Sequence, residues 1–332
     1  MDHFKAMYLE ETNGQLEFAA QMITLADLGQ GDVVIKVAYT SLNYKDMLAV
    51  QPKGGVIRHY PMVPGIDLAG TVVSSESNDF VKGQEVLVTG YEMGMSHTGG
   101  FAQYARVPKD WVVPLPENLS LKDVMIYGTA GLTAILSILA LENAGLSERK
   151  EARVLVTGAS GGVGSVAIAL LKERGYHNVT ALIRKDYQEA IVKDLGADQV
   201  IRPEAIFIKE KPLLLKEQYD YVLDTVGGDV ASHLIPQVAY NGAMSLCGNA
   251  AGISLNSNVL PFILRGVNLL GIDSVQISQD KRLEAWKALA DAKTILGKLK
   301  TNTIILEDIP ESLQALKEGR HVGRTVVEVD YP

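Results

Sequence analysis

A glycine-rich turn in the middle of the chain constrains the fold more than any other feature. Residues 157–164 read Thr-Gly-Ala-Ser-Gly-Gly-Val-Gly, directly after the apolar run Arg153–Thr157 and before a helical pattern over Val163–Arg174. A strand, a glycine turn and a helix in succession leave free backbone N–H groups at a helix N-terminus, where the helix dipole favours a phosphate. The pattern predicts a dinucleotide-binding α/β fold, and a glycine turn that only packs helix on strand is the alternative.

The bulk composition bounds the remaining possibilities. A chain of 332 residues predicts two domains, and a net charge of -8 argues against nucleic acid and anionic membrane as partners. The single cysteine, Cys247, excludes an intrachain disulfide and a zinc site built on several cysteines. Because the first residues have no apolar segment of the signal-peptide kind, a cytoplasmic location is expected.

One uncharged stretch, Val124–Leu141, is long enough to suggest a membrane span. Interspersed Gly, Thr and Ser residues dilute its hydrophobicity, and Asp123 and Glu142 flank it. It also directly precedes the glycine turn of a soluble fold. We therefore expect a buried helix and no membrane association.

The chain changes its pattern near residues 112–120, a proline-containing segment that predicts a boundary. Before it, short β-branched runs punctuated by Gly, Pro and Asn predict antiparallel strands. After it, strands alternate with helices, which predicts a parallel sheet. A charged amphipathic helix is expected over residues 280–299, and a final strand over 323–329 is expected to return to the first domain. The expected strands are 33–37, 70–73 and 85–88 in the first part, and 153–157, 178–183, 219–224, 243–247 and 267–272 in the second.

Two basic residues, Arg184 and Lys185, follow the second strand of the predicted dinucleotide fold. An NAD site commonly carries Asp or Glu there, where it accepts from the ribose 2′-hydroxyl. Two cations would instead attract the 2′-phosphate of NADPH, to which Ser160 would donate. We expect the protein to prefer NADPH over NADH. The alternative is that Arg184 and Lys185 are solvated charges at the start of a helix.

Several further motifs narrow the family. The turn alone also fits short-chain dehydrogenases, but about 150 residues precede it and no Tyr has a Lys four residues later. More specific motifs than the turn occur at residues 41–46 (SLNYKD), 60–70 (YPMVPGIDLAG), 128–134 (GTAGLTA), 262–267 (FILRGV) and 271–274 (GIDS). With these motifs the whole chain resembles the medium-chain dehydrogenase/reductase superfamily, closest to its zinc-free YhdH/YhfP-type quinone oxidoreductase branch, which includes acrylyl-CoA reductases.

The resemblance implies an α/β architecture in which a GroES-like β-rich domain is joined to a Rossmann domain with a doubly wound parallel sheet. The expected bounds are 1–124 with 276–332 for the GroES-like domain, and 125–275 for the Rossmann domain. It also implies an active-site cleft between the domains, and a homodimer formed through a sheet-edge strand near residues 267–274.

Zinc is not expected. Zinc alcohol dehydrogenases of this superfamily carry Cys in the segment matching residues 40–43 and a Gly-His-Glu run in the segment matching 64–67, and this chain has neither. Its six histidines are scattered without ligand spacing. Without a Lewis acid, a substrate that is already activated towards hydride is favoured, either an α,β-unsaturated carbonyl or a quinone.

The resemblance places the active-site segment at Asn43, Tyr44, Lys45 and Asp46. Hydride addition to an enoyl thioester builds negative charge on the carbonyl oxygen, which an amide, a cation or a hydroxyl would stabilise. The structural alternatives are that Tyr44 packs in the fold and that Asp46 caps a helix. Lys53 and Arg58, beside His59, would meet the phosphates of a CoA thioester, or form a solvated basic loop.

The resemblance also implies cofactor contacts at the expected nicotinamide-side helix, at strand ends and near the C-terminus. These residues, with the turn and the basic pair, are Thr133, Ser160, Gly161, Gly162, Val163, Arg184, Lys185, Thr225, Cys247, Gly248, Asn249, Asp273, Ser274 and Arg324. Cys247 is expected to be a small packing residue and not a nucleophile, because no His is near it in sequence.

The sequence leaves the reaction open among three hypotheses. An NADPH-dependent reductase of enoyl thioesters such as acrylyl-CoA is favoured, and a one- or two-electron quinone reductase on the same scaffold is the near alternative. A non-catalytic dinucleotide-binding protein is the distant one. The proton donor and the substrate's chain length are not specified by these residues.

Overall fold

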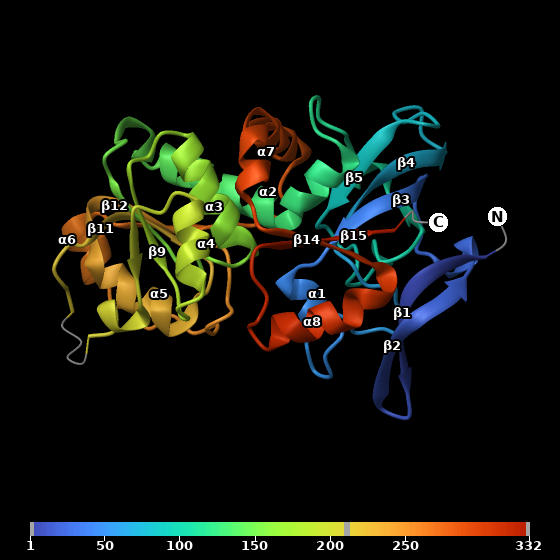
Figure 1. The fold of residues 1–332 in the computed structure, drawn as a ribbon, viewed down its shortest axis with the longest axis horizontal. Helices are drawn as coiled ribbons and strands as arrows, with labels where there is room; N and C mark the ends of the chain where they lie inside the picture. Colours follow the sequence, from blue (N-terminus) through green and yellow to red (C-terminus); the bar gives the residue numbers. More distant parts are fainter. Residues whose placement is uncertain (1–2, 209–212, 330–332) are drawn as a thin grey trace. The chain divides into compact units, whose positions relative to one another are not determined.

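The computed structural model describes residues 3–208 and 213–329, and the chain divides into two compact units. The first holds the chain up to Thr129, the segment Val275–Lys293 and the chain from Thr301; the second holds Ala130–Ser274 and Thr294–Lys300. The domain boundaries expected from the sequence, between residues 124 and 125 and between residues 275 and 276, stay predictions. Figure 1 traces the chain through both units.

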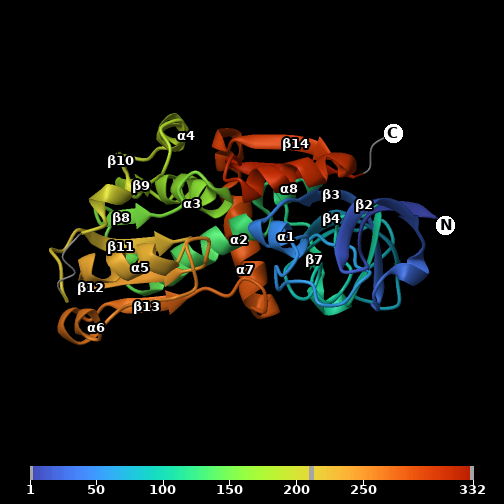
Figure 2. The same ribbon diagram turned by 90° about the horizontal axis from the view of Figure 1, so that it is seen from below.

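The second unit contains a six-stranded parallel sheet. Its strands lie in the order β10-β9-β8-β11-β12-β13, so the chain order reverses between β8 and β11, as in doubly wound nucleotide-binding folds. Figure 2 shows these strands one above another in this order. β8 and β11 are buried almost throughout, which explains their continuous apolar runs. The strands are β8 (Arg153–Val156), β9 (Asn178–Leu182), β10 (Gln199–Ile201), β11 (Tyr219–Asp224), β12 (Val238–Leu246) and β13 (Asn268–Gly271).

Short helices connect these strands, as parallel pairing requires. In α3 every residue from Gly164 to Leu171 is buried, because the helix leaves the glycine turn and packs against the strands. The five strands that the sequence predicted in this part are confirmed, while the short β10 was not expected. The helices are α3 (Gly162–Glu173), α4 (Gln188–Asp194), α5 (Gly228–Leu234) and α6 (Leu260–Arg265).

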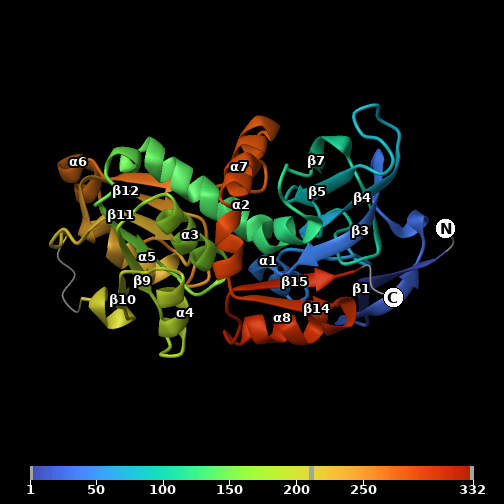
Figure 3. The same cartoon turned by 45° about the horizontal axis from the view of Figure 1, so that its top comes forward.

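The first unit is built on a seven-stranded, mostly antiparallel sheet with the order β14-β15-β3-β4-β5-β7, where β6 also pairs with β3. β1 and β2 form a separate hairpin. The strand β15 pairs with β3, so the C-terminal strand does return to the first part of the chain, as predicted. Figure 3 shows α8 beside β14 and β15. The elements are β1 (Phe4–Thr12), β2 (Gln15–Ile23), β3 (Val33–Ser41), α1 (Tyr44–Ala49), β4 (Asp67–Ser75), β5 (Glu85–Thr89), β6 (Tyr104–Val107), β7 (Val113–Pro114), β14 (Thr301–Ile305), α8 (Ile309–Lys317) and β15 (Arg324–Glu328).

The long apolar helix α2 (Leu121–Asn143) breaks at Gly128, whose φ of 52° and ψ of -158° are not helical. Among the described residues, α2 is the one helix long and apolar enough to cross a membrane, and 72% of its most apolar window is buried inside the protein. Burial of this kind is what a core helix shows, in agreement with the expectation of a buried helix.

The amphipathic helix expected over residues 280–299 is shorter in the structure. α7 (Gln279–Asp291) ends at Asp291 with Ala292 as its C-cap residue, and a 3₁₀ segment, Lys293–Lys298, follows it. The carbonyl of Ala292 accepts a hydrogen bond from the buried Tyr127 hydroxyl at 3.0 Å. This tertiary contact satisfies a carbonyl at the helix end that the sequence pattern alone does not reveal.

Candidate functional site

The glycine turn lies at the carboxyl end of β8 and opens α3, whose N-cap residue is Gly161. The N–H groups of Gly162, Val163 and Gly164 have no acceptor among the described residues, since the first hydrogen bond of the helix is that of Ser165 to Gly161. Ser160 is buried beside them, only 5% exposed. Three free N–H groups at one helix N-terminus form a cradle for an anion such as a pyrophosphate.

Close packing makes glycine necessary in this turn. A Cβ on Gly164 would lie 2.3 Å from the carbonyl oxygen of Gly158, and a Cβ on Gly158, whose φ is +56°, would lie 2.3 Å from Thr225 Oγ1. Neither position tolerates a larger residue without movement of the turn. The sequence pattern therefore reflects helix–strand packing as well as an open cradle.

Hydrogen bonds made by Asp224 and Thr157 join the strand ends beside the glycine turn. The Thr157 hydroxyl donates to Asp224 Oδ1 at 2.7 Å and the Gly227 N–H donates to Oδ2 at 2.7 Å. The Thr225 hydroxyl donates to the carbonyl of Thr157 at 2.9 Å, and its N–H donates to the Thr157 hydroxyl. Burial raises the pKa of Asp224, and the hydrogen bonds from Thr157 and Gly227 oppose the shift. Two hydrogen bonds to Thr157 hold Thr225 at the carboxyl edge of the sheet.

Of the other expected cofactor residues of this unit, Thr133 lies in α2, and the rest follow the ends of β12 and β13. The Thr133 hydroxyl donates to Ser274 Oγ at 2.9 Å, so two residues 141 positions apart are brought together. Gly248 follows β12 and packs against the carbonyl of Thr225, with exposed Asn249 next to it. Asp273, near the end of β13, is also exposed.

Cys247 packs at the end of β12. Its N–H and thiol both lie against the carbonyl of Asp224, at 3.0 and 3.2 Å. Burial raises the pKa of the thiol to about 12, so almost none of it is thiolate at neutral pH. This agrees with the expectation that Cys247 is not a nucleophile.

The basic residues Arg184 and Lys185 follow β9, and both are exposed. Their backbone N–H groups donate to the side-chain oxygen of Gln188, at 3.0 Å each. The Lys185 ammonium lies 5.8 Å from the centre of the Tyr187 ring. Both cations are therefore accessible to a ligand at the carboxyl edge of the sheet.

In the first unit, Asp67 is the centre of a buried polar network. Its Oδ2 accepts hydrogen bonds from Ser41 Oγ at 2.6 Å, Asn43 Nδ2 at 2.8 Å and the Thr129 N–H at 2.9 Å, and its Oδ1 accepts from the Thr129 hydroxyl. Sequence reasoning did not identify Asp67 as a site residue. The only signal was its place in the family motif over residues 60–70.

Arg324 lies in the same network, 2% exposed. Its guanidinium donates to Ser41 Oγ at 3.0 Å and to the carbonyls of Leu42 at 3.2 Å and Ile126 at 2.8 Å, and it lies 3.5 Å from Asn43 Oδ1. Burial lowers the pKa of Arg324, while the negative charge of Asp67 opposes that shift. Most of its donors are therefore engaged within the fold, and its role as a cofactor contact stays a prediction.

The predicted active-site segment at the start of α1 contains both buried and exposed residues. The amide of Asn43 is oriented by Asp67 and Arg324, and Asn43 is 9% exposed. Asp46 is fully buried and accepts from the N–H groups of Asn43 at 2.8 Å and Ile66 at 3.0 Å, as the capping alternative expected. Tyr44 is 41% exposed, and Lys45 is half-buried.

The buried carboxyl of Asp46 is expected to make the stability of the fold depend on pH. Burial, and then the charge of Asp67, raise its pKa from 3.8 to about 7 in the folded chain. Between these two values the folded state binds a proton that the unfolded state does not, so stability falls as pH rises. We expect the free energy of unfolding of the native chain, minus that of Asp46→Asn, to decrease by about 1 kcal/mol per pH unit between pH 4 and 7. Denaturant unfolding at a series of pH values measures this difference; a constant value across the range would refute the assignment.

The tentative substrate residues Lys53 and Arg58 lie in the segment that follows α1, and both are exposed. Lys53 adopts a left-handed backbone with a φ of 62°, and Gly54 beside it approaches the carbonyl of Leu48 too closely for a Cβ. The segment has a defined turn conformation, which presents both cations to solvent.

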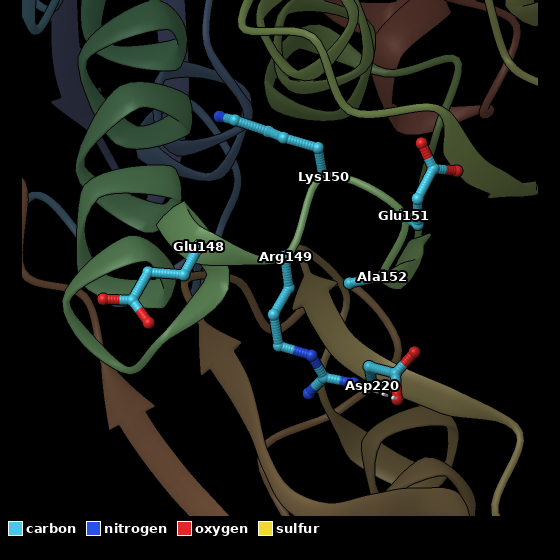
Figure 4. A pocket seen from close by; sticks show the side chains of 6 residues that line it. All are labelled: Glu148, Arg149, Lys150, Glu151, Ala152 and Asp220. Carbon is cyan, nitrogen blue, oxygen red and sulfur yellow. Dashed lines mark hydrogen bonds and ion pairs between the residues drawn. The ribbon is translucent and has the colours of Figure 1, made fainter.

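No group of three or more His, Cys, Asp or Glu residues that could hold a metal ion occurs within residues 3–208 and 213–329. A separate hollow in the second unit is lined by residues 148–152 and Asp220 (Figure 4). It lies at the amino ends of β8 and β11, where Asp220 pairs with Arg149 and Arg153. Because ligands of such sheets bind at the carboxyl ends of the strands, this ion-pair cluster is structural.

Residues 29–117 match the family model of the alcohol dehydrogenase GroES-like domain, and residues 162–291 match that of zinc-binding dehydrogenases. The chain is 41% identical over 323 residues to the acrylyl-CoA reductase AcuI of Ruegeria pomeroyi, covering 97% of both chains. It belongs to the medium-chain dehydrogenase/reductase superfamily.

Solved structures of this superfamily agree over nearly the full chain. The yhdH oxidoreductase from Salmonella enterica, solved in complex with NADP, superposes with a TM-score of 0.94 at 42% identity and covers 98% of this chain and 100% of its own. The Bacillus subtilis protein yhfP, solved with NAD bound, gives 0.95 at 42% identity over 99% and 100% of the two chains. The chain therefore has a GroES-like domain and a Rossmann domain, and its resemblance to the YhdH/YhfP-type branch is confirmed.

Proposed function

We propose that this protein is an NADPH-dependent reductase that transfers hydride to an activated C=C bond of an enoyl-CoA thioester such as acrylyl-CoA, without zinc. The observation that carries the proposal is the similarity to an acrylyl-CoA reductase over 97% of both chains. The open N–H cradle at the start of α3 supports the same conclusion, because it fits the pyrophosphate of a dinucleotide.

The residues present fit NADPH at the carboxyl edge of the parallel sheet. The N–H groups of Gly162, Val163 and Gly164 would hold the pyrophosphate, and Ser160 with Arg184 and Lys185 would meet the 2′-phosphate. The other proposed contacts are Thr133, Gly161, Thr225, Cys247, Gly248, Asn249, Asp273, Ser274 and Arg324. When bound, NADPH supplies the hydride; the protein orients the substrate and stabilises its developing charge.

Hydride addition to the β-carbon places negative charge on the thioester carbonyl oxygen, which needs hydrogen-bond donors or a cation. We assign this role to Asn43, Tyr44 and Lys45. Asp67 and Arg324 hold the Asn43 amide in one orientation, and Asp46 fixes the backbone N–H of the same residue. Tyr44 and Lys45 lie closer to solvent, so their hydroxyl and ammonium groups are available to a substrate. Asp46 itself acts as a positioning residue, because it is fully buried.

Turnover decides among the possible functions. We expect the purified protein to oxidise NADPH rapidly with acrylyl-CoA, and more slowly with crotonyl-CoA and with several quinones, as followed by the loss of nicotinamide absorbance. Fast turnover restricted to quinones would favour a quinone reductase instead. Tight NADPH binding without turnover of any substrate would favour a non-catalytic binding protein. Metal analysis of the same preparation tests the zinc-free mechanism, which stoichiometric zinc would refute.

Arg184→Ala is expected to lower kcat/KM for NADPH by about 10- to 100-fold and to leave kcat/KM for NADH unchanged. The reason is the loss of a charge-assisted hydrogen bond to the 2′-phosphate, which NADH lacks. Arg320→Ala is the matched control, because Arg320 is an exposed arginine of the first unit that pairs with Glu318. Steady-state kinetics with both cofactors measure the effect. An equal loss with NADPH and NADH would contradict the assignment.

Arg58→Ala is expected to raise KM for acrylyl-CoA by about 3- to 10-fold at low salt, with a smaller effect at high salt, because an exposed cation attracts the CoA phosphates through a screened field. KM for an uncharged quinone is expected to stay constant. Lys82→Ala, which removes another exposed cation of the first unit, is the control. If KM for the CoA thioester does not change, the basic segment is a solvated loop.

We also infer a homodimer and a cytoplasmic location. β13 is an edge strand of the parallel sheet, and the preceding α6 carries exposed apolar side chains, with Ile263 68% and Leu264 56% exposed. An edge strand beside an apolar surface is well suited to pairing with a second copy. Sedimentation equilibrium measures the assembly directly.

A further inference from the structure

The turn between β9 and α4 is held by one buried side chain, that of Gln188. Gln188 is only 7% exposed, although it is the first residue of α4. Its Oε1 accepts from the N–H of Arg184 at 3.0 Å and from the N–H of Lys185 at 3.0 Å. Its own N–H donates to the carbonyl of Lys185 at 3.1 Å. The side-chain amide of Gln188 therefore holds the turn between β9 and α4 through the backbone N–H groups of Arg184 and Lys185.

This arrangement determines how the turn meets an anion. Because both consecutive N–H groups are used by Gln188, the turn presents the side chains of Arg184 and Lys185 and not its backbone. The negative charges beside them are also paired, since Arg202 donates to Asp186 Oδ1 and Glu189 Oε2 at 3.0 Å each. The local field at the carboxyl edge is consequently positive.

We propose that Gln188 is a positioning residue that sets the coenzyme selectivity of this protein. It holds the turn in the conformation that directs Arg184 and Lys185 at a ribose 2′-phosphate. The backbone N–H groups of Arg184 and Lys185 both need a hydrogen-bond acceptor. The amide oxygen of Gln188 is a neutral acceptor, so it adds no negative charge near the 2′-phosphate. The inference rests on the proposed binding of NADPH at this turn, and it adds a residue that does not itself contact the coenzyme.

Calorimetric titration with 2′,5′-ADP and 5′-AMP tests the proposal without any turnover, because the two ligands differ only in the 2′-phosphate. In Gln188→Leu we expect the affinity for 2′,5′-ADP to fall about tenfold and that for 5′-AMP to stay within about twofold. A loss of this size corresponds to one well-placed hydrogen bond between the basic side chains and the 2′-phosphate. Gln199→Leu is the matched control, since Gln199 is exposed on the neighbouring β10; neither affinity should change.

The outcomes are distinguishable. If Gln188→Leu keeps the wild-type preference for 2′,5′-ADP, or weakens both ligands equally, the selectivity role is refuted. A wild-type protein that binds both ligands equally would refute the proposed NADPH preference and this inference with it. Should Gln188→Leu fail to fold, Gln188→Glu keeps an acceptor for both N–H groups and is expected to fold and to weaken 2′,5′-ADP by its charge. Unchanged affinity in Gln188→Glu would overturn the proposal.

Discussion

Replacing Asp67 with alanine is expected to lower the free energy of unfolding by about 3–5 kcal/mol. The carboxylate accepts hydrogen bonds from Ser41, Asn43 and Thr129, and all three donors would lose their acceptor. The buried guanidinium of Arg324 would also lose the nearby negative charge that offsets its desolvation. Asp46, the other carboxyl whose charge raises the pKa of Arg324, would remain, but a buried cation with less compensation is still far more costly than a lost surface contact.

Asp79→Ala is the matched control. Asp79 is exposed and pairs with Lys109 on the surface of the same unit, so its removal is expected to change the free energy of unfolding far less than the removal of Asp67. Denaturant unfolding followed by circular dichroism compares the two variants with the wild type. Similar losses in both variants would show that the buried network contributes no more than a surface ion pair. Because the network also orients Asn43, a lower kcat is expected under conditions where Asp67→Ala remains folded.

Replacing Gly164 with alanine is expected to weaken NADPH binding by about 100-fold. The added Cβ would lie 2.3 Å from the carbonyl oxygen of Gly158 and 2.8 Å from the Cα of Ala159, so the turn must move away from the helix. Such a movement displaces the free N–H groups of Gly162 and Val163 from the phosphate position. Losing one or two charge-assisted hydrogen bonds to a phosphate, each worth about 1.5–3 kcal/mol, lowers an affinity by roughly this factor.

A glycine in open surroundings separates this effect from the general effect of adding a methyl group. A Cβ on Gly297, which lies in the 3₁₀ segment Lys293–Lys298, would meet no heavy atom within 4 Å. Gly297→Ala should leave the affinity within about twofold of the wild type. Titration of NADPH fluorescence measures both variants, with thermal unfolding as a check that each is folded. An affinity of Gly164→Ala within threefold of the wild type would show that the turn does not form the pyrophosphate site.

The parallel sheet was predictable because its determinants are local. Each central strand is a short apolar run, and glycine is required where the chain turns tightly from β8 into α3. The absence of the paired Tyr and Lys, together with the long β-rich segment before the turn, was enough to choose between two dehydrogenase families. The end of α7 at Asp291 was missed because it coincides with a hydrogen bond from Tyr127, more than 160 residues away in sequence.

By itself, the sequence determined the two-part architecture, the position of the glycine turn and that of the basic pair Arg184 and Lys185, because these depend on patterns within a few consecutive residues. Only the tertiary structure decided what surrounds them. Asp67 and Arg324 share a buried network although most of the chain separates them, and Gln188 acts through backbone groups that carry no sequence signal. Hydrogen bonds between distant segments depend on the folded geometry, and burial determines their strength.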